Sequence, residues 1–178
     1  MAKSLKFLAL ILFLTGFLVT ISCESKERDY YKVTEVHDGD TVTIIMDSFL
    51  GIFLKTERIR LIGIDAPELA QEPWGRKAKN HLKKLIKESD GMVRLELDVQ
   101  HRDKYGRVLA YLWRKDGKMI NYLMIRDGYA MLYTVPPNVK YVELFTEAQK
   151  LARNETRGIW GKDGLSETPS KWRKEHPR

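Results

Sequence analysis

The chain has 178 residues and a formal net charge of +7, from 31 Lys and Arg against 24 Asp and Glu. This length suits one domain with a hydrophobic core of its own. The basic balance is compatible with a polyanionic partner, with an anionic membrane or with neither. The single cysteine, Cys23, excludes an intramolecular disulfide, so the core must stabilise the fold.

Residues 1–22 are typical of a bacterial export signal. Lys3 and Lys6 form a short basic region, and the segment 7–22 follows without a charge. A spanning helix needs about 20 apolar residues, so this shorter run suits a secretory signal better. The alternatives are ordinary secretion and an uncleaved anchor.

The end of this segment predicts attachment of lipid. The small residue Ser22 precedes Cys23, the spacing of a bacterial lipoprotein signal, with cleavage before the cysteine and lipid on its thiol. The polar residues 23–30 would then tether a domain at 31–160 to the membrane. We therefore expect an extracytoplasmic, membrane-anchored lipoprotein.

The rest of the chain alternates between strand and helix patterns. Strands are expected at 31–36, 41–46, 58–64, 92–99 and 108–114, and helices at 73–88, 121–126 and 138–153. Asp38-Gly39 between the first two strands predicts a hairpin, and Asn138 is the candidate N-cap of the last helix. This order predicts an α+β fold, mainly β: a five-stranded Greek-key barrel of the OB-fold type with about three helices. Residues 161–178 lack periodicity and are expected to form a basic, loosely ordered tail.

Three separated stretches carry polar residues near strand ends: "DGDT" (38–41), "RLIGIDAPE" (60–68) and "DKYGR" (103–107). An acid such as Asp40 is disfavoured at the start of a strand and gains nothing locally. Alternation places Arg60 on one face with apolar residues, so its guanidinium needs an anion, either a protein carboxylate or a ligand phosphate.

Taken together, these stretches meet the needs of phosphodiester hydrolysis. Asp40 and Asp65 can supply hard oxygen ligands for Ca²⁺ or Mg²⁺. Arg60 and Arg107 can bind a phosphate through planar forks, and a further carboxylate can activate water. The four histidines show no metal-ligand spacing, so we expect no zinc site.

With "INYLMIRDGYA" and "RGIW", these motifs follow the order found in the thermonuclease (staphylococcal nuclease) family, which the chain resembles over about residues 30–160. The resemblance implies the barrel fold and a monomeric endonuclease. It also implies calcium-dependent cleavage of DNA and RNA at the bond to the 5′-oxygen, which leaves 3′-phosphates. One Ca²⁺ ion is expected, with Mg²⁺ as the less favoured alternative.

The resemblance also assigns roles by motif. Asp40 and Asp65 become the calcium carboxylates, and the backbone carbonyl of Ala66 becomes the third protein ligand. Many relatives have Thr at this position, which a carbonyl ligand tolerates.

Three side chains match the catalytic positions of the family. Glu68 takes the role of general base, and Arg60 and Arg107 bind the phosphate, with Arg107 on the leaving side. In the empty enzyme we expect Glu68 to supply the counter-charge of Arg60. Tyr105 matches a nucleotide-contacting tyrosine, and Tyr133 is the candidate for a second one, in a segment one residue shorter than the family pattern.

Two other functions stay open at this point. A catalytically weak lipoprotein that binds nucleic acid or an anionic polymer could use the same barrel. A surface adhesin is the third reading, but it gives no reason for two arginines and three acids of this pattern to occur together. Loss of one of those five side chains would favour a binding module, and all five are present.

Overall fold

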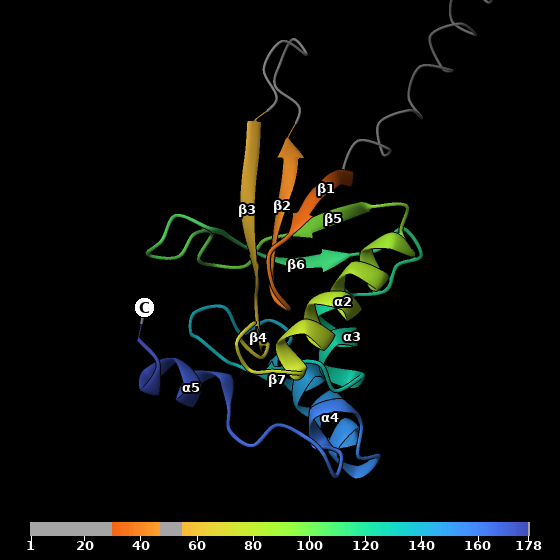
Figure 1. The fold of residues 1–178 in the computed structure, drawn as a ribbon. Coiled ribbons are helices and arrows are strands. Elements are labelled where there is room, and N and C mark those ends of the chain that lie inside the picture. The colour runs from red at the N-terminus through yellow and green to blue at the C-terminus, as the bar shows by residue number, and fades with distance from the viewer. Residues whose placement is uncertain (1–29, 47–54, 178) are drawn as a thin grey trace, which may run out of the picture.

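The computed structural model of the chain describes residues 30–46 and 55–177 (Figure 1). The signal expected at 1–22, Cys23 and nearly all of the expected tether lie outside the described residues. Within the part that is described, no helix has both the length and the apolar character needed to cross a membrane.

The strands and helices follow the predicted order. The strands are β1 (Tyr30–Val36), β2 (Thr41–Met46), β3 (Lys55–Leu61), β4 (Ile64–Asp65), β5 (Met92–Glu96), β6 (Val108–Trp113) and β7 (Met131–Leu132). The helices are α2 (Trp74–Lys87), α3 (Ile120–Arg126), α4 (Val142–Asn154) and α5 (Pro169–Glu175), with a 3-10 turn, η2, at Gly158–Trp160. The predicted α+β fold is confirmed, with a fourth helix, α5, that was not expected.

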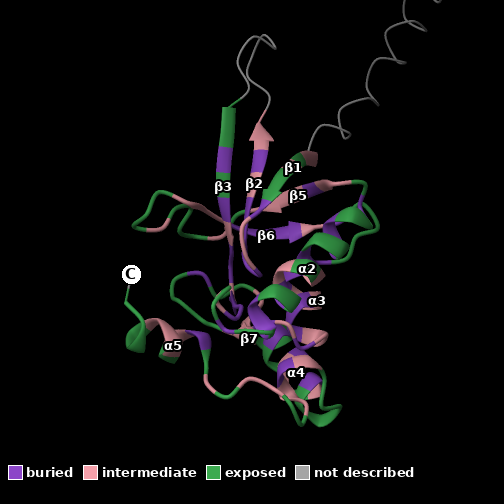
Figure 2. Cartoon of the chain, viewed as in Figure 1, coloured by how far each residue is buried: buried purple, intermediate pink, exposed green. Residues whose placement is uncertain are grey.

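Five strands close into a barrel in the order β1-β2-β3-β6-β5, and β5 pairs back with β1. All neighbours are antiparallel except β3 and β6, which run parallel with Ile59 opposite Val108. Alternate residues of the strands are buried in the barrel, as Figure 2 shows in purple. The fully buried ones include Val42, Ile44, Ile59, Val93 and Leu112. Burying each such side chain stabilises the fold by roughly 1.5–3 kcal/mol.

The helices α2 and α3 pack against one end of the barrel (Figure 1). On α2, residues at helical spacing such as Ala78, Leu82, Leu85 and Ile86 are buried, whereas the lysines lie on the other side. This apolar stripe, rather than the lysine face, sets the orientation of α2.

Asn121 on α3 connects two parts of the barrel. Its side chain is fully buried: Oδ1 accepts a hydrogen bond from the Leu112 N–H at 2.9 Å, and Nδ2 donates to the Ile62 carbonyl at 2.8 Å. A buried amide that satisfies two backbone groups of separate segments holds both in place. Asn121 therefore fixes the turn after β3 against β6.

A two-stranded sheet, β4 with β7, follows that turn. Gly63 has φ +77°, and a Cβ there would lie 2.5 Å from the Phe145 ring, so glycine is required both by conformation and by space. The pairing of Ile64 with Leu132 and of Asp65 with Met131 then fixes the backbone of Asp65.

The prediction that Asn138 caps the last helix is wrong, because α4 begins only at Val142. Asn138 is buried, and its side chain instead links two loops. Oδ1 accepts from the Gln100 N–H at 2.7 Å, and Nδ2 donates to the Gln100 carbonyl at 2.9 Å. The amide therefore satisfies a distant backbone rather than a helix terminus.

The prediction of a tail without regular structure is wrong for α5. Thr168 is its N-cap and accepts from the Lys171 N–H at 3.2 Å, and Pro169 occupies the first turn. In Figure 1 the segment after α4 leads to α5, at the left of the picture beside β4. The helix is short and nearly without apolar periodicity, so the hydrophobic pattern did not reveal it.

Candidate active site

Asp40 lies buried just before β2, and neighbouring segments fix its carboxylate. Oδ2 accepts from the Ala66 N–H at 3.0 Å, and Oδ1 accepts from the Thr41 hydroxyl at 3.1 Å. The carbonyl of Asp40 accepts from the Leu61 N–H at 2.9 Å. The acid therefore joins β2, β3 and the segment after β4.

The loop before Asp40 requires glycine at position 39 and carries a second acid, Asp38. A Cβ at Gly39 would lie 2.5 Å from the Ala66 Cβ and 2.8 Å from the Ala78 Cβ, so only glycine allows this close approach. Asp38 Oδ1 accepts from the Asp40 N–H at 3.0 Å. Burial and the nearby charge of Asp40 raise the pKa of Asp38 to about 6. The sequence analysis gave Asp38 only a role in the hairpin. Its position two residues before Asp40 could have indicated a second acid near the site.

Asp65 and Glu68 project from the segment that follows the Gly63 turn. Asp65 is 2% exposed, and this burial raises the pKa of its carboxyl, which Arg173 only partly offsets. The Glu68 N–H donates to Gln71 Oε1 at 2.9 Å, and its carbonyl accepts from the Gln71 N–H at 2.8 Å. Gln71 therefore fixes the turn that carries Glu68.

Arg60 connects the two aspartates. Its Nη2 lies 3.2 Å from Asp40 Oδ2 and 3.7 Å from Asp65 Oδ1. The guanidinium also donates to the carbonyls of Leu61 at 2.6 Å and Ile64 at 2.9 Å. Asp40 and Asp65 therefore supply counter-charge to Arg60, a role that was expected of Glu68.

The apolar residues expected on the face of Arg60, Ile62 and Ile64, lie beyond the end of its strand. Strand β3 ends at Leu61, and its buried alternate residues are Glu57, Ile59 and Leu61. Arg60 lies on the opposite face of this strand and is only partly buried. The turn at Gly63 breaks the alternation, and so brings the Ile64 carbonyl and the Asp65 carboxylate of β4 back to the guanidinium.

Arg107 and Tyr105 lie on the turn before β6. Asp103 organises this turn: Oδ1 accepts from the N–H groups of Tyr105 and Arg107, and Oδ2 accepts from Arg107 Nε at 2.7 Å. Burial alone would raise the pKa of Asp103, but these hydrogen bonds lower it. Because Val108 pairs with Ile59, the parallel strands bring this turn to the neighbourhood of Arg60.

Tyrosines lie exposed on two segments of the site region. Tyr105 is 72% exposed, and the Arg107 guanidinium lies 5.5 Å from the centre of its ring. Tyr133 is 43% exposed, and its N–H donates to the Gly63 carbonyl at 2.9 Å. Tyr133 therefore lies at the end of the small sheet that carries Asp65.

Sequence reasoning missed Arg173 on α5. Nη1 donates to Asp65 Oδ1 at 2.9 Å and to Glu68 Oε1 at 3.0 Å, and Nη2 donates to Asp65 Oδ2 at 3.0 Å. The sequence did hold a signal for the helix, since Thr168-Pro169 is a favoured N-cap and first-turn pair. No local pattern could indicate a contact between residues 108 apart.

The donors fit a hard cation. Asp40 and Asp65 are buried and bring oxygens to the same nitrogen of Arg60, and Ala66 adjoins both through the chain and its N–H. Among the described residues, no three His, Cys, Asp or Glu side chains form a group that could hold a metal ion. A divalent cation here would need backbone and water oxygens in addition to these two carboxylates.

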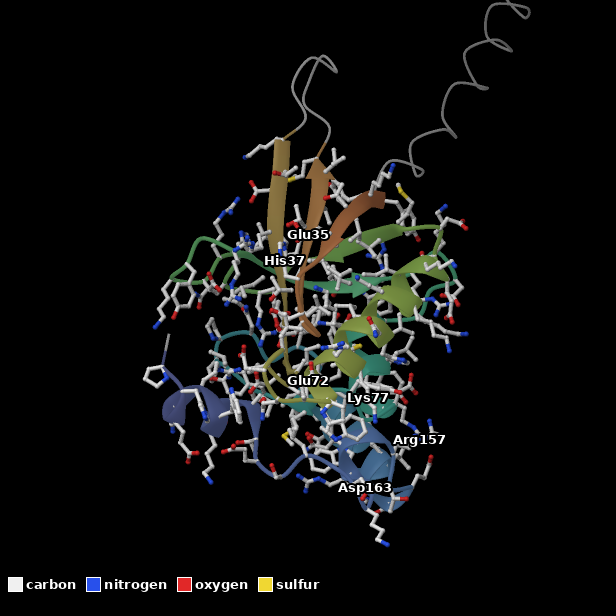
Figure 3. All side chains as sticks on the ribbon, viewed as in Figure 1. Glu35, His37, Glu72, Lys77, Arg157 and Asp163 are labelled. Carbon is white, nitrogen blue, oxygen red and sulfur yellow. The ribbon has the colours of Figure 1, made fainter. Side chains whose placement is uncertain are left out.

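Other charged groups lie apart from this cluster. Figure 3 shows Glu35 and His37 on the barrel, Glu72 and Lys77 on the region where α2 begins, and Asp163 beside α4. Glu35 and His37 approach to 3.4 Å, and Glu72 pairs with Arg76 at 2.8 Å. These pairs are at the surface and give matched sites for control substitutions.

The chain is similar in sequence to known nucleases. Residues 58–162 match the family model described as "Staphylococcal nuclease homologue". The chain is 41% identical over 135 residues to the thermonuclease of Staphylococcus intermedius, which covers 73% of this chain and 75% of that protein. It is 38% identical over 136 residues to the thermonuclease of Staphylococcus hyicus, with the same coverage.

Two relatives of lower identity are endonucleases by name. Endonuclease YncB of Bacillus subtilis is 33% identical over 134 residues, 71% of this chain and 59% of that protein. An uncharacterized endonuclease of Escherichia coli is 32% identical over 168 residues, 94% of this chain and 97% of that protein. The closed five-stranded barrel, the linked acids and arginine on it and these matches lead to one conclusion: the chain belongs to the staphylococcal nuclease (thermonuclease) family.

Proposed function

We propose that the chain is a calcium-dependent endonuclease that hydrolyses phosphodiester bonds of DNA and RNA on the 5′-oxygen side and leaves 3′-phosphates. The observation that carries this proposal is the Arg60 guanidinium between Asp40 and Asp65, with Glu68 three residues further along the chain. The thermonucleases and endonucleases among the relatives support the same reaction class.

Each charged residue has a separate task in this reaction. Asp40, Asp65 and the carbonyl of Ala66 would hold the cation, which supplies positive charge against the scissile phosphate. Arg60 and Arg107 bind phosphate oxygens through their planar forks. They stabilise the negative charge that grows as the transition state forms.

Glu68 accepts a proton from the attacking water, whose oxygen forms the new bond to phosphorus. The bond from phosphorus to the 5′-oxygen breaks, and Arg107 stabilises the leaving oxygen until it takes up a proton from solvent. The exposed rings of Tyr105 and Tyr133 are available to stack on bases of a single strand, a contact that tolerates any sequence. The substrate is therefore proposed to be nucleic acid without strict sequence preference.

Arg60→Lys tests the proposal because a lysine keeps the charge but loses the fork. We expect roughly a 100-fold or greater loss of kcat on single-stranded DNA. Arg58→Lys is the matched control, since Arg58 is exposed on the same strand. Turnover of Arg60→Lys at the level of Arg58→Lys would contradict the proposed role. Binding of DNA by the wild-type chain without any cleavage would instead support the alternative of a binding lipoprotein.

The proposed place of action is outside the cytoplasm, on a membrane, through lipid on Cys23. The basic start, apolar segment and Ser22-Cys23 junction support this proposal, and secretion is the alternative. Cys23→Ala should move the protein from the membrane fraction to the soluble fraction. Retention of this variant in the membrane fraction would contradict attachment through the thiol.

A further inference from the structure

Arg173 of α5 covers the carboxylates of the proposed cation site. Its two terminal nitrogens donate to both oxygens of Asp65, at 2.9 and 3.0 Å, and one also reaches Glu68 at 3.0 Å. Asp65 is a proposed cation ligand, and Glu68 is the proposed base. One side chain from the C-terminal region therefore binds both groups on which the proposed reaction depends.

This arrangement competes with a bound cation. Ca²⁺ takes carboxylate oxygens at about 2.3–2.6 Å, closer than a guanidinium nitrogen approaches them. The Arg173 fork faces both Asp65 oxygens at once, so a cation that used this side of the carboxylate would displace it. Even on the other side, the cation would repel the guanidinium and neutralise the charge that holds it.

Little else holds α5 in place. Pro169 is the only buried residue of this seven-residue helix. An open pocket of about 230 Å³ is lined by Trp74, Asp163 and Trp172, so the segment is not closely packed against the start of α2. A helix with so little apolar burial depends on polar contacts for its position.

The segment before α5 is attached by polar contacts as well. Trp74 Nε1 donates to the Asp163 carbonyl at 3.0 Å, and Gln71 Nε2 donates to the Glu167 carbonyl at 3.2 Å. These contacts would keep α5 near the site if Arg173 dissociated from the carboxylates. The guanidinium therefore acts as a tethered group, present at a high local concentration.

We propose that α5 is an autoinhibitory element in which Arg173 closes the site until a divalent cation displaces it. The inference rests on the proposed cation site at Asp40 and Asp65. Because coupling between two bound groups is reciprocal, the cation weakens the docking of α5 by the factor by which α5 weakens the cation. Arg173 thus sets the cation concentration at which α5 leaves the proposed cation site.

The test is Ca²⁺ binding, measured by titration calorimetry on the full chain in detergent. Arg173→Ala should bind Ca²⁺ roughly 5- to 30-fold more tightly than the wild type. Lys174→Ala, an exposed neighbour with the same loss of charge, should stay within about 2-fold. Unchanged or weaker binding by Arg173→Ala overturns the competition but leaves the cation site intact. Absence of Ca²⁺ binding in both proteins overturns the cation site, and the competition with it.

Hydrogen exchange gives a second readout that needs no substitution. The N–H groups of Trp172 and His176 are bonded within α5, to the carbonyls of Thr168 and Trp172. Saturating Ca²⁺ should speed exchange in residues 168–176 and leave α3 unchanged. Slower or unchanged exchange in this segment would mean that Arg173 stays in the site with the cation, contrary to the proposal.

Discussion

The two segments that meet at the acids are built in different ways. The segment that carries Asp65 is paired with β7, lies behind the Gly63 turn and is anchored to Asp40 by the Ala66 N–H. The segment after η2 has one buried residue in its helix and is attached mainly by side chains that reach the backbone. Strand pairing and a buried hydrogen bond hold the first segment, whereas side-chain contacts to the backbone hold the second.

This difference separates the acids of the site, which keep their positions, from α5, which can move. Proposed catalytic groups need fixed positions, and Asp65 lies on a segment anchored by strand pairing and by Asp40. A segment held by a few exposed polar contacts opens at a small cost in free energy. The acids are therefore permanent features of the fold, whereas the contact with Arg173 is reversible.

The largest expected effect is on activity, at Glu68. Glu68→Gln keeps the size of the side chain but removes the proposed proton acceptor, so kcat on single-stranded DNA should fall by roughly 10²- to 10⁴-fold. The melting temperature should change little, because the turn is held by Gln71 through the backbone of residue 68. Steady-state kinetics and thermal unfolding check the two statements.

The matched control is Glu72→Gln. Glu72 is an exposed acid at the start of α2, paired with Arg76 at 2.8 Å. Its loss should leave kcat within about 2-fold of the wild type, since exposed pairs contribute little. Equal kcat for the two variants would remove Glu68 from the mechanism.

The largest expected effect on stability is at Asn121, which joins the turn after β3 to β6. Asn121→Ala leaves the Leu112 N–H and the Ile62 carbonyl without their buried partner. The free energy of unfolding should fall by roughly 2–4 kcal/mol, as measured in urea. A loss below about 0.5 kcal/mol would show that the turn after β3 is held by other contacts.

A smaller effect is expected at Glu57, on the barrel. Hydrogen bonds from Arg102 and Lys55 lower the pKa of Glu57 from 4.5 to about 2. The folded state therefore gains stability from the charged form above pH 4.5, and this gain is lost as pH falls from 4.5 towards 2.

Glu57→Gln should flatten this part of the stability curve. The difference between wild type and variant should shrink by roughly 1–2 kcal/mol between pH 6 and pH 2.5. Chemical unfolding at several pH values measures it. A difference that stays constant across this range would mean that Glu57 keeps its ordinary pKa in the folded protein.

The smallest effect is expected at Thr168, in the surface-held segment. Thr168→Ala removes the N-cap of α5 and should destabilise the helix by about 0.5–1 kcal/mol. We expect this segment to open independently of the barrel, so hydrogen exchange in residues 169–176 should quicken while the global melting temperature stays the same. A fall in global stability of the same size would show that α5 unfolds only with the barrel.

The sequence predicted what depends on local pattern. Alternation and helical spacing placed the five barrel strands and three of the helices, because their buried faces repeat at fixed periods. The motifs also singled out residues that the structure brings close together. The structure links Asp40, Asp65 and Arg60 directly, and strand pairing brings the turn with Arg107 near them.

The sequence did not predict the features that depend on a turn of the chain or on a contact between residues far apart in the sequence. The turn at Gly63 brings Asp65 to Arg60, and Asp40 approaches the same guanidinium from the start of β2. Asn138 bonds to Gln100 rather than to a helix end. Arg173 reaches Asp65 through a contact set by tertiary packing, which leaves no periodic trace in the sequence.

The most direct test of the proposed function is cleavage of end-labelled single-stranded DNA, with Ca²⁺ or with EGTA. With Ca²⁺, the purified chain should release fragments that carry 3′-phosphate ends, and EGTA should stop the reaction. Cleavage that continues in EGTA, or fragments that carry 5′-phosphate and 3′-hydroxyl ends, would contradict a cation at Asp40 and Asp65 or the assigned scissile bond.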